Sequence, residues 1–116
     1  MDSDAYFRGI SLFNHAQFFE AHEVLEDVWR ATAGEEKRFL QGLIQVAVAF
    51  HHYSTGNKVG ARSLLGRSAR NLAAYPENFG GIQLASLLET LAQWRRALDH
   101  GSPLPSLPRI ETLEKR

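Results

Sequence analysis

One short stretch of the sequence holds most of the residues that could do chemistry. It runs from residue 18 to residue 29 and reads Phe-Phe-Glu-Ala-His-Glu-Val-Leu-Glu-Asp-Val-Trp. If this stretch is helical, the turn of about 100° per residue places His22, Glu26 and Trp29 along one edge of its apolar face. The remaining acidic residues then point outward. A histidine and a carboxylate at the boundary between buried and exposed surface are positioned as a functional polar pair would be.

A second group of polar residues falls in the next apolar segment of the chain. Gln41, Gln45 and His52 share one narrow stripe of a helix, and His51 falls among apolar residues. Buried amide and imidazole groups need hydrogen-bond partners, because each one left unsatisfied costs about 1–3 kcal/mol. We therefore expect His51 to be almost fully buried and hydrogen-bonded to a side chain of the preceding helix.

These two groups have two interpretations. In one, they form a small polar site that holds a metal ion or activates water, with His22, Glu26 and His51 as the metal ligands. In the other, which we prefer, they form a hydrogen-bonded brace that fixes how two helices pack. Both interpretations predict that His22 and Glu26 are largely buried and face the next helix.

Known metal motifs support the first interpretation only weakly. The pattern His-Glu-x-x-Glu has a glutamate where the zinc-protease motif His-Glu-x-x-His has its second histidine. It also lacks the paired Glu-x-x-His segments of di-iron proteins. The sequence neither requires nor identifies a cofactor.

Charge is balanced overall but separated along the chain. Thirteen Lys and Arg residues are matched by thirteen Asp and Glu residues, which argues against nucleic acid and anionic membranes as partners. One predicted helix is locally basic, with no acidic residue between Lys58 and Pro76 and four cations: Lys58, Arg62, Arg67 and Arg70. We expect it to lie beside the acidic helix around Glu23 and to be neutralised by it. Binding of phosphate or nucleic acid by the basic helix is the less favoured alternative.

Apolar periodicity predicts an all-α protein, a compact bundle of about five helices arranged as hairpins. Apolar residues recur at helical spacing in five segments, near 4–14, 17–30, 35–55, 58–74 and 84–98. Asp4 is the expected cap of the first helix, and Gly34 is expected to close the second in a left-handed conformation. The third segment is apolar almost all round, so we place it at the centre of the fold.

An internal repeat relates the first two hairpins. Three residues of the first recur in the second at a constant offset: Ala16, Ala21 and Leu25 against Gly56, Ala61 and Leu65. Small residues beside a turn let two helices approach closely, as in tetratricopeptide repeats. Two imperfect units are fewer than an array of such repeats needs. We interpret the repeat as architecture and not as a sign of peptide binding.

The chain beyond residue 100 differs in kind. Pro103, Pro105 and Pro108 exclude a helix and favour an extended, polyproline-like course. Four apolar residues recur there every three positions: Leu104, Leu107, Ile110 and Leu113. We predict one helical domain over residues 1–100 and an extended tail over 101–116 whose apolar residues dock together on it. Order is expected to fail first at the charged end, 114–116.

On these residues the chain resembles a bacterial and archaeal family, the domain of unknown function 309. The resemblance spans about 7–72 and lies in Phe13-Asn14, 18–26 with Trp29, 39–45 with His51, Gly56-Asn57 and Gly60-Ala61. It implies a compact all-helical domain and brings no established activity. It also implies that the family's polar signature falls on His22, Glu23, Glu26, Gln41, Gln45 and His51. Ala16 stands where the resemblance leads us to expect a glycine.

Taken together, the sequence favours a non-enzymatic helical module that binds a protein or a small polar ligand. The alternative is a metal- or water-using hydrolase centred on His22 and Glu26. The sequence has no cysteine, so it offers no disulfide and no thiolate site. Its longest apolar run is too short to span a membrane, and its acidic start does not read as a signal peptide. We expect a soluble, cytoplasmic protein whose partner is another protein or a second copy of the chain.

Overall fold

The computed structural model describes residues 1–113, which fold into five α-helices and one short 3-10 helix. In chain order these are α1 (Ser3–Asn14), α2 (Phe18–Arg30), α3 (Glu35–Ser54), α4 (Lys58–Leu72), η1 (Phe79–Gly81) and α5 (Leu84–His100). This confirms the predicted all-α bundle of five helices. No helix in the described range is long and apolar enough to cross a membrane.

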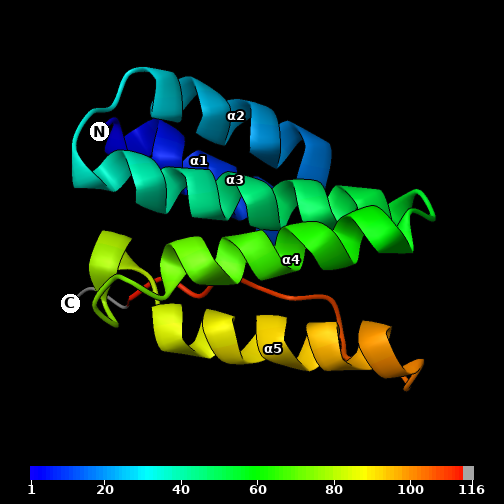
Figure 1. Ribbon diagram of the computed structural model, residues 1–116. Coiled ribbons are helices and arrows are strands. Elements are labelled where there is room, and N and C mark those ends of the chain that lie inside the picture. Colours follow the sequence, from blue (N-terminus) through cyan, green and yellow to red (C-terminus); the bar gives the residue numbers. More distant parts are fainter. Residues whose placement is uncertain (114–116) are drawn as a thin grey trace.

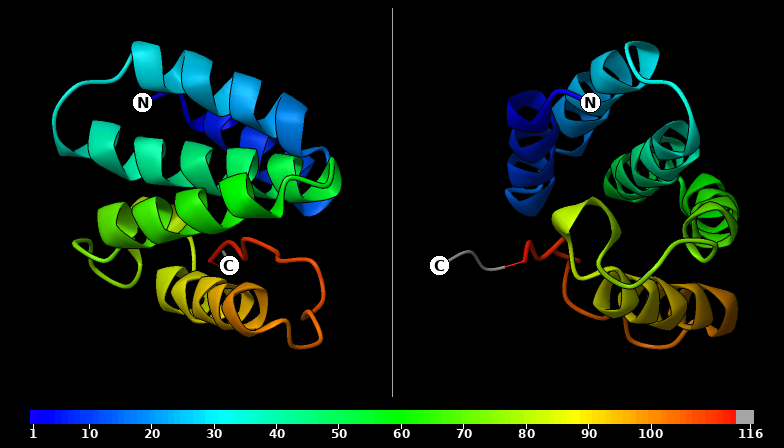
Figure 2. Two further views of the ribbon diagram at one scale, coloured as in Figure 1. Left: turned by 45° about the vertical axis from the view of Figure 1, so that its right-hand side comes forward. Right: turned by 90° about the vertical axis from the view of Figure 1, so that its left-hand side faces the viewer.

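The third helix, α3, lies at the centre of the bundle, as predicted. Figure 1 shows α2 and α4 on opposite sides of α3, with α5 below α4. Figure 2, seen end-on at right, shows that the helices follow an arc around the core. α3 supplies six wholly buried apolar side chains to that core: Phe39, Leu40, Leu43, Val46, Ala47 and Ala49. Because α3 is apolar almost all round, it is covered by other helices on two sides.

This position of α3 overturns one expectation from the charge pattern. The acidic helix α2 and the basic helix α4 were predicted to be neighbours that neutralise each other. They pack instead on opposite sides of α3, and no ion pair joins them in residues 1–113. The carboxylates Glu26 and Asp27 pair with Arg30 of their own helix, and Arg62 of α4 pairs with Asp99 of α5.

The predicted repeat corresponds to two turns of the same backbone design. Ala16 and Gly56 both have a positive φ, of 61° and 89°. The next residue of each turn donates its N–H back to the preceding helix, Gln17 to the carbonyl of Leu12 and Asn57 to that of His52. A positive φ suits glycine, because a Cβ atom is crowded there. The backbone at Ala16 is therefore strained, whereas the backbone at its counterpart Gly56 is not.

The helix ends differ from prediction in two caps. Asp2, not Asp4, caps α1, because its carboxylate accepts a hydrogen bond from the N–H of Ala5 at 3.1 Å while Asp4 already lies in the first turn. Gly34, expected to close α2, precedes α3 as its N-cap residue with φ 77° and ψ −157°. Val59, an apolar residue in the first turn of α4, is 71% exposed, because the buried stripe of α4 passes through Ala61 and lies on another side.

A buried tyrosine ties α1 to the turn before α5. The Tyr6 hydroxyl donates to the carbonyl of Gly80 at 2.7 Å. Burial raises the pKa of this hydroxyl well above its ordinary value, and the carboxylate of Glu36 raises it further. Tyr6 is therefore a neutral donor throughout the physiological range, and it fixes the start of the first helix against η1.

The C-terminal segment from residue 101 runs back along α5 in an extended course (Figure 1). Asn14 holds it with two hydrogen bonds: its amide donates to the carbonyl of Ile110 at 3.0 Å and its oxygen accepts from the N–H of Ile110 at 2.7 Å. The indole of Trp94 donates to the carbonyl of Ser106. Ile110 is buried, so this segment covers part of the core between α1 and α5.

The expectation that all four apolar tail residues dock together was wrong for one of them. Leu104 and Leu113 are half-buried, but Leu107 is 49% exposed. Exposed and buried residues alternate over 107–110, as side chains do along an extended strand, so the three-residue period is not kept. The chain then pairs with Ile82 through an antiparallel bridge at Thr112. The last predicted tail residues, 114–116, lie outside the described range.

The contact of Gly42 in α3 with Leu72 in α4 leads to a stability prediction. A Cβ atom at Gly42 would lie 2.7 Å from the Leu72 side chain, whereas one at Gly66 would meet only ordinary contacts of 3.6 Å or more. Gly42→Ala should therefore lower the free energy of unfolding by about 1–3 kcal/mol through overpacking. Gly66→Ala, the matched control in the next helix, should raise it by about 0.5–1 kcal/mol. Urea denaturation measures both, and equal effects at the two positions would contradict the packing described.

We propose that the tail is part of the folded unit, and Asn14 tests this. Asn14→Ala should lower the free energy of unfolding by about 1–3 kcal/mol, because it leaves the backbone groups of the buried Ile110 without their partners. Ser11→Ala, at an exposed position of the same helix, should change it by less than about 0.5 kcal/mol. If chemical denaturation gives the two variants the same midpoint, the tail contributes nothing to the fold.

Candidate functional site

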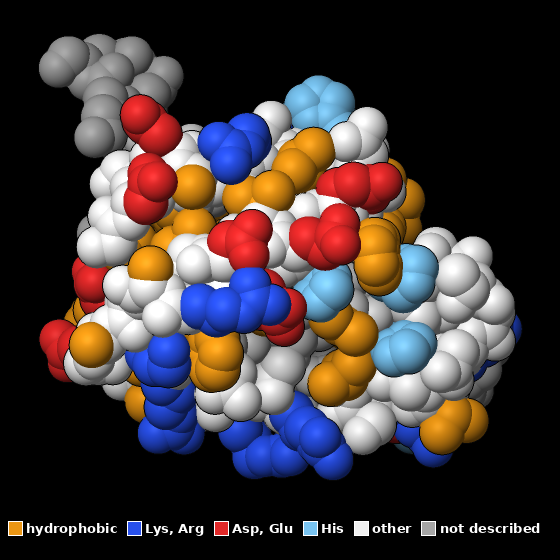
Figure 3. Space-filling view, turned by 90° about the horizontal axis from the view of Figure 1, so that it is seen from above, with side chains coloured by type: hydrophobic (Ala, Val, Ile, Leu, Met, Phe, Trp, Pro, Cys, Tyr) orange, Lys and Arg blue, Asp and Glu red, His pale blue; other side chains and the backbone are white. Residues whose placement is uncertain are grey.

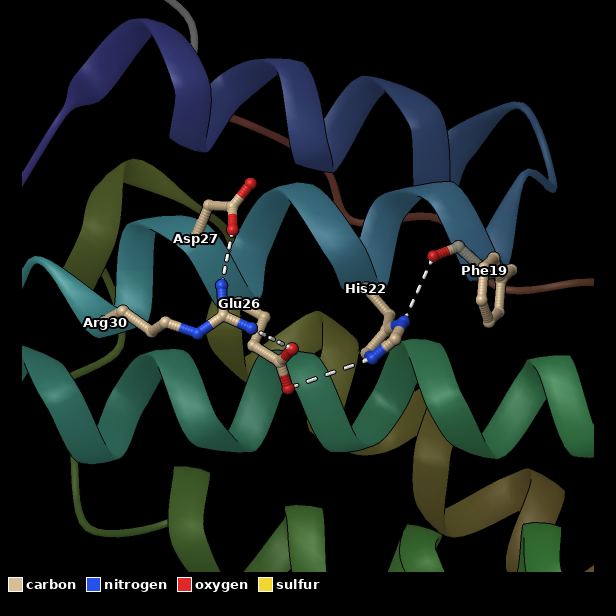
Figure 4. Close-up of polar contacts among 5 residues, drawn as sticks. All are labelled: Phe19, His22, Glu26, Asp27 and Arg30. Atoms are coloured by element: carbon tan, nitrogen blue, oxygen red, sulfur yellow. Dashed lines mark hydrogen bonds and ion pairs between the residues drawn. The ribbon is translucent and has the colours of Figure 1, made fainter.

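The α2 helix divides its residues into buried, exposed and intermediate faces. Four apolar residues face the core: Phe18, Ala21, Leu25 and Val28. His22 and Glu26 extend toward α3, as Figure 4 shows, while Asp27 points away from it. Their side chains are 22% and 38% exposed. The expectation that they are largely buried was therefore wrong for Glu26, whose carboxylate lies at the protein surface.

The His22 ring is oriented by its own helix. Its Nδ1 lies 3.2 Å from the carbonyl oxygen of Phe19. Because a carbonyl only accepts, Nδ1 carries the hydrogen and donates it. Nε2 then lies 3.9 Å from Oε2 of Glu26, which is too far for a hydrogen bond. The two groups attract each other strongly only when the imidazole is protonated.

Glu26 finds its strongest partner one turn further along α2. Its Oε1 lies 2.8 Å from Nη2 of Arg30, and the same guanidinium also pairs with Asp27 (Figure 4). Pairs spaced three or four residues apart on an exposed helix surface contribute only about 0.3–0.5 kcal/mol each. Glu26 is thus held by local surface pairs, not by a buried brace between helices.

The glutamines of α3 do not converge on His22 and Glu26. Gln45 accepts a hydrogen bond from the amide of Asn71 at 2.8 Å, so it faces α4. Gln41 is exposed. A helix that turns about 100° per residue places positions 45 and 51 roughly 120° apart. This is why Gln45 and His51 cannot both contact α2.

His51 contacts α2 through an aromatic ring and not through a hydrogen bond. It is half-buried, and its ring centroid lies 5.2 Å from that of Phe19. The predictions that His51 is almost fully buried and hydrogen-bonded to a side chain of α2 were wrong. An imidazole at this boundary keeps a polar edge in water and needs no protein partner.

Phe19 is the residue whose position the sequence reasoning missed. Its ring lies 5.4 Å from the ring of His22 and 5.2 Å from that of His51, and the side chain is 45% exposed. The available signal was its neighbour Phe18. Two consecutive residues of a helix point about 100° apart. Because α2 has one apolar face, with Phe18 on it, Phe19 falls toward the edge of that face.

A second aromatic contact lies at the other end of the same boundary. The ammonium group of Lys37 lies 3.9 Å from the centroid of the Trp29 ring and donates to the carbonyl of Trp29 at 2.8 Å. A cation is also favourable at this position, because the carbonyl groups at the C-terminal end of α2 carry partial negative charge. We name this boundary the α2–α3 seam and define it by six residues: Phe19, His22, Glu26, Trp29, Lys37 and His51.

Carboxylates surround the seam on the outer side of α2. Figure 3 looks down on this face and shows acidic side chains next to histidines, with apolar side chains between them. A shallow open depression there is lined by Glu20, Glu23, Val24, Glu26, Asp27 and Arg30. Glu20 and Glu23 form no ion pair in residues 1–113. The face is therefore acidic with an exposed aromatic side chain at its edge.

The seam does not assemble the metal ligands named from the sequence. In the described part of the chain, no three His, Asp or Glu residues are placed so that they could hold a metal ion together. His22 and Glu26 lie near each other, whereas His51 contacts α2 through the Phe19 ring. The arrangement offers aromatic surface and acidic charge in place of a ligand cluster.

The local pairing of Glu26 generates a second stability prediction. Glu26→Ala should lower the free energy of unfolding by about 0.5–1 kcal/mol, and the loss should shrink in high salt because the pairs are exposed. Glu20→Ala, which removes an unpaired exposed carboxylate, should have an effect below about 0.5 kcal/mol. A loss of more than about 3 kcal/mol at Glu26 in urea denaturation would restore the buried-brace interpretation.

Comparison with known proteins places the chain in a family without a known activity. The model of a domain of unknown function (DUF309) matches residues 6–64. An uncharacterized protein of Aquifex aeolicus (strain VF5) is 33% identical over 92 residues, which are 78% of this chain and 28% of that protein. The uncharacterized protein YpuF of Bacillus subtilis (strain 168) is 41% identical over 58 residues, 49% of this chain and 33% of that protein.

The chain thus spans about a third of the length of the relatives it matches. The family match begins in α1 and ends within α4, so it contains all six seam residues. The resemblance seen in the sequence is confirmed: the chain belongs to the DUF309 family.

Proposed function

We propose that the chain is a non-enzymatic binding module that takes a segment of a partner protein on the α2–α3 seam. The observation that carries this proposal is the exposure of Phe19 between two histidine rings. Large aromatic side chains supply much of the binding energy of protein interfaces. Contact with His22 and His51 restricts the Phe19 ring, so little conformational entropy is lost when a partner covers it.

The charge of the surroundings supports a basic partner segment. The carboxylates of Glu20 and Glu23 lie one turn or less from Phe19 and are exposed without ion-pair partners in the described residues. A segment that places an apolar side chain over Phe19 and Lys or Arg beside these carboxylates matches the seam in shape and sign. Such complementarity sets association rate and specificity.

Other functions receive less support from the same geometry. A hydrolase centred on His22 and Glu26 would need further groups to converge on them, and His51 and Gln45 lie elsewhere. A second copy of the chain or a small polar ligand are alternative occupants of the seam. The proposal also includes the cytoplasmic location expected from the sequence.

Peptide titration of the isotope-labelled chain tests the proposal. The probes are an amphipathic peptide of leucine and lysine and its counterpart of leucine and glutamate. The basic peptide should shift the amide signals of Phe19, His22 and His51 saturably, and the acidic one should not. Phe19→Ala should weaken this binding at least about tenfold, or 1.4 kcal/mol. Phe7→Ala, at an exposed phenylalanine of α1, is the matched control and should leave it unchanged.

Three results would count against this function. Equal weakening by Phe19→Ala and Phe7→Ala would show general hydrophobic adhesion. Shifts of the seam signals on raising the protein concentration alone would assign the seam to self-association. Stoichiometric metal in protein purified without chelator, lost in His22→Ala, would favour the hydrolase.

A further inference from the structure

The basic helix α4 lies on the far side of α3 from the seam, beside α5. Because α3 separates α4 from the acidic helix, the α4 cations have no acidic helix beside them (Figure 1). α4 itself contains no acidic residue. Three of its cations and one of α5 are exposed: Arg62, Arg67, Arg70 and Arg96.

Two arginines converge on one point of the α4–α5 interface. A Cβ atom built on Gly66 would lie 3.6 Å from Nη1 of Arg70 and 3.7 Å from Nη2 of Arg95. Arg70 comes from α4 and the half-buried Arg95 from α5, and Gly66 lies buried beneath both. Nη1 of Arg70 and Nη2 of Arg95 therefore lie beside the same turn of α4.

These two guanidinium groups have no carboxylate partner among residues 1–113. In residues 1–113 neither Arg70 nor Arg95 takes part in an ion pair, whereas Arg62, one turn before Gly66, pairs with Asp99 at 3.5 Å. Like charges held near each other repel. An anion placed between them is attracted by both, and the forked donors of guanidinium match the oxygens of a phosphate group.

We infer that Gly66, Arg70 and Arg95 form a binding site for a phosphate group, named here the Gly66 site. The guanidinium groups of Arg70 and Arg95 donate hydrogen bonds to its oxygens. The chain has no net charge, but this does not prevent it from binding an anion. Salt screens charges beyond about 10 Å, so the anion responds mainly to the nearby arginines. The site is separate from the seam and does not depend on the proposed function.

Phosphate titration of the full chain tests this inference, with amide signals as the readout. The probes are inorganic pyrophosphate and, separately, a single-stranded oligonucleotide of twelve thymidines. At least one probe should shift the signals of Gly66, Arg70 and Arg95 saturably. Arg70→Gln and Arg95→Gln should each raise the Kd of that probe about tenfold. Arg8→Gln makes the same charge change at an exposed position of α1 and should alter the Kd by less than about twofold.

The two probes distinguish the source of the phosphate. Saturation by pyrophosphate at lower concentration than by the oligonucleotide assigns a small phosphorylated molecule. Tighter binding of the oligonucleotide, with a logarithmic salt slope of about −0.7 per phosphate contacted, assigns a polynucleotide backbone.

The inference is overturned if neither probe gives saturable shifts at Gly66, or if Arg8→Gln weakens binding as much as Arg70→Gln does. Unchanged circular dichroism of the arginine variants shows that they fold. Phe19→Ala should leave phosphate binding intact, so failure at the seam and failure at the Gly66 site are told apart.

Discussion

The burial of α3 from two sides is the constraint on which the rest of the structure depends. A helix that is apolar almost all round must be covered on opposite faces, and here α2 and α4 do so. That arrangement keeps the acidic helix away from the basic one. Each helix is therefore neutralised only in part. In α2, Arg30 pairs with Glu26 and Asp27, and in α4, Arg62 pairs with Asp99 of α5. The two charged faces of a neutral protein follow from where one apolar helix has to lie.

Small residues set how closely the covering helices approach. Gly9 lies against Leu25 and Gly42 against Leu72, in each case too near for an added Cβ atom to fit without movement. Close approach of α3 and α4 also brings Gln45 to Asn71. The matching turns at Ala16 and Gly56 repeat the same hairpin geometry on both sides of the core. At the boundary between α2 and α3, where the two hairpins meet, side chains such as His22 and Phe19 stay partly exposed to solvent.

Sequence periodicity could predict which face each helix buries, but not which side chains meet across elements. The edge position of His22 follows from the helical turn alone, and it is found there. The prediction that Glu26 is buried assumed a partner in α3. Glu26 pairs instead with Arg30, which is nearer and lies in the same helix. His51 and Gln45 were assigned to one site because both are polar, although the angle between them on α3 sends them to different neighbours. Helix crossing geometry decides such pairings, and it is not encoded in the spacing of any one segment.

The extent of the family match separates the two proposed surfaces. Residues 6–64 contain the complete seam and stop before Gly66, Arg70 and Arg95. Part of the Gly66 site comes from α5, outside that match altogether. An exposed aromatic side chain beside acidic charge therefore belongs to the part of the fold that defines the family. The converging arginines belong to the part that follows it. Because the wholly buried core of α3 stands between them, a substitution on either surface can change one kind of binding without disturbing the packing that supports the other.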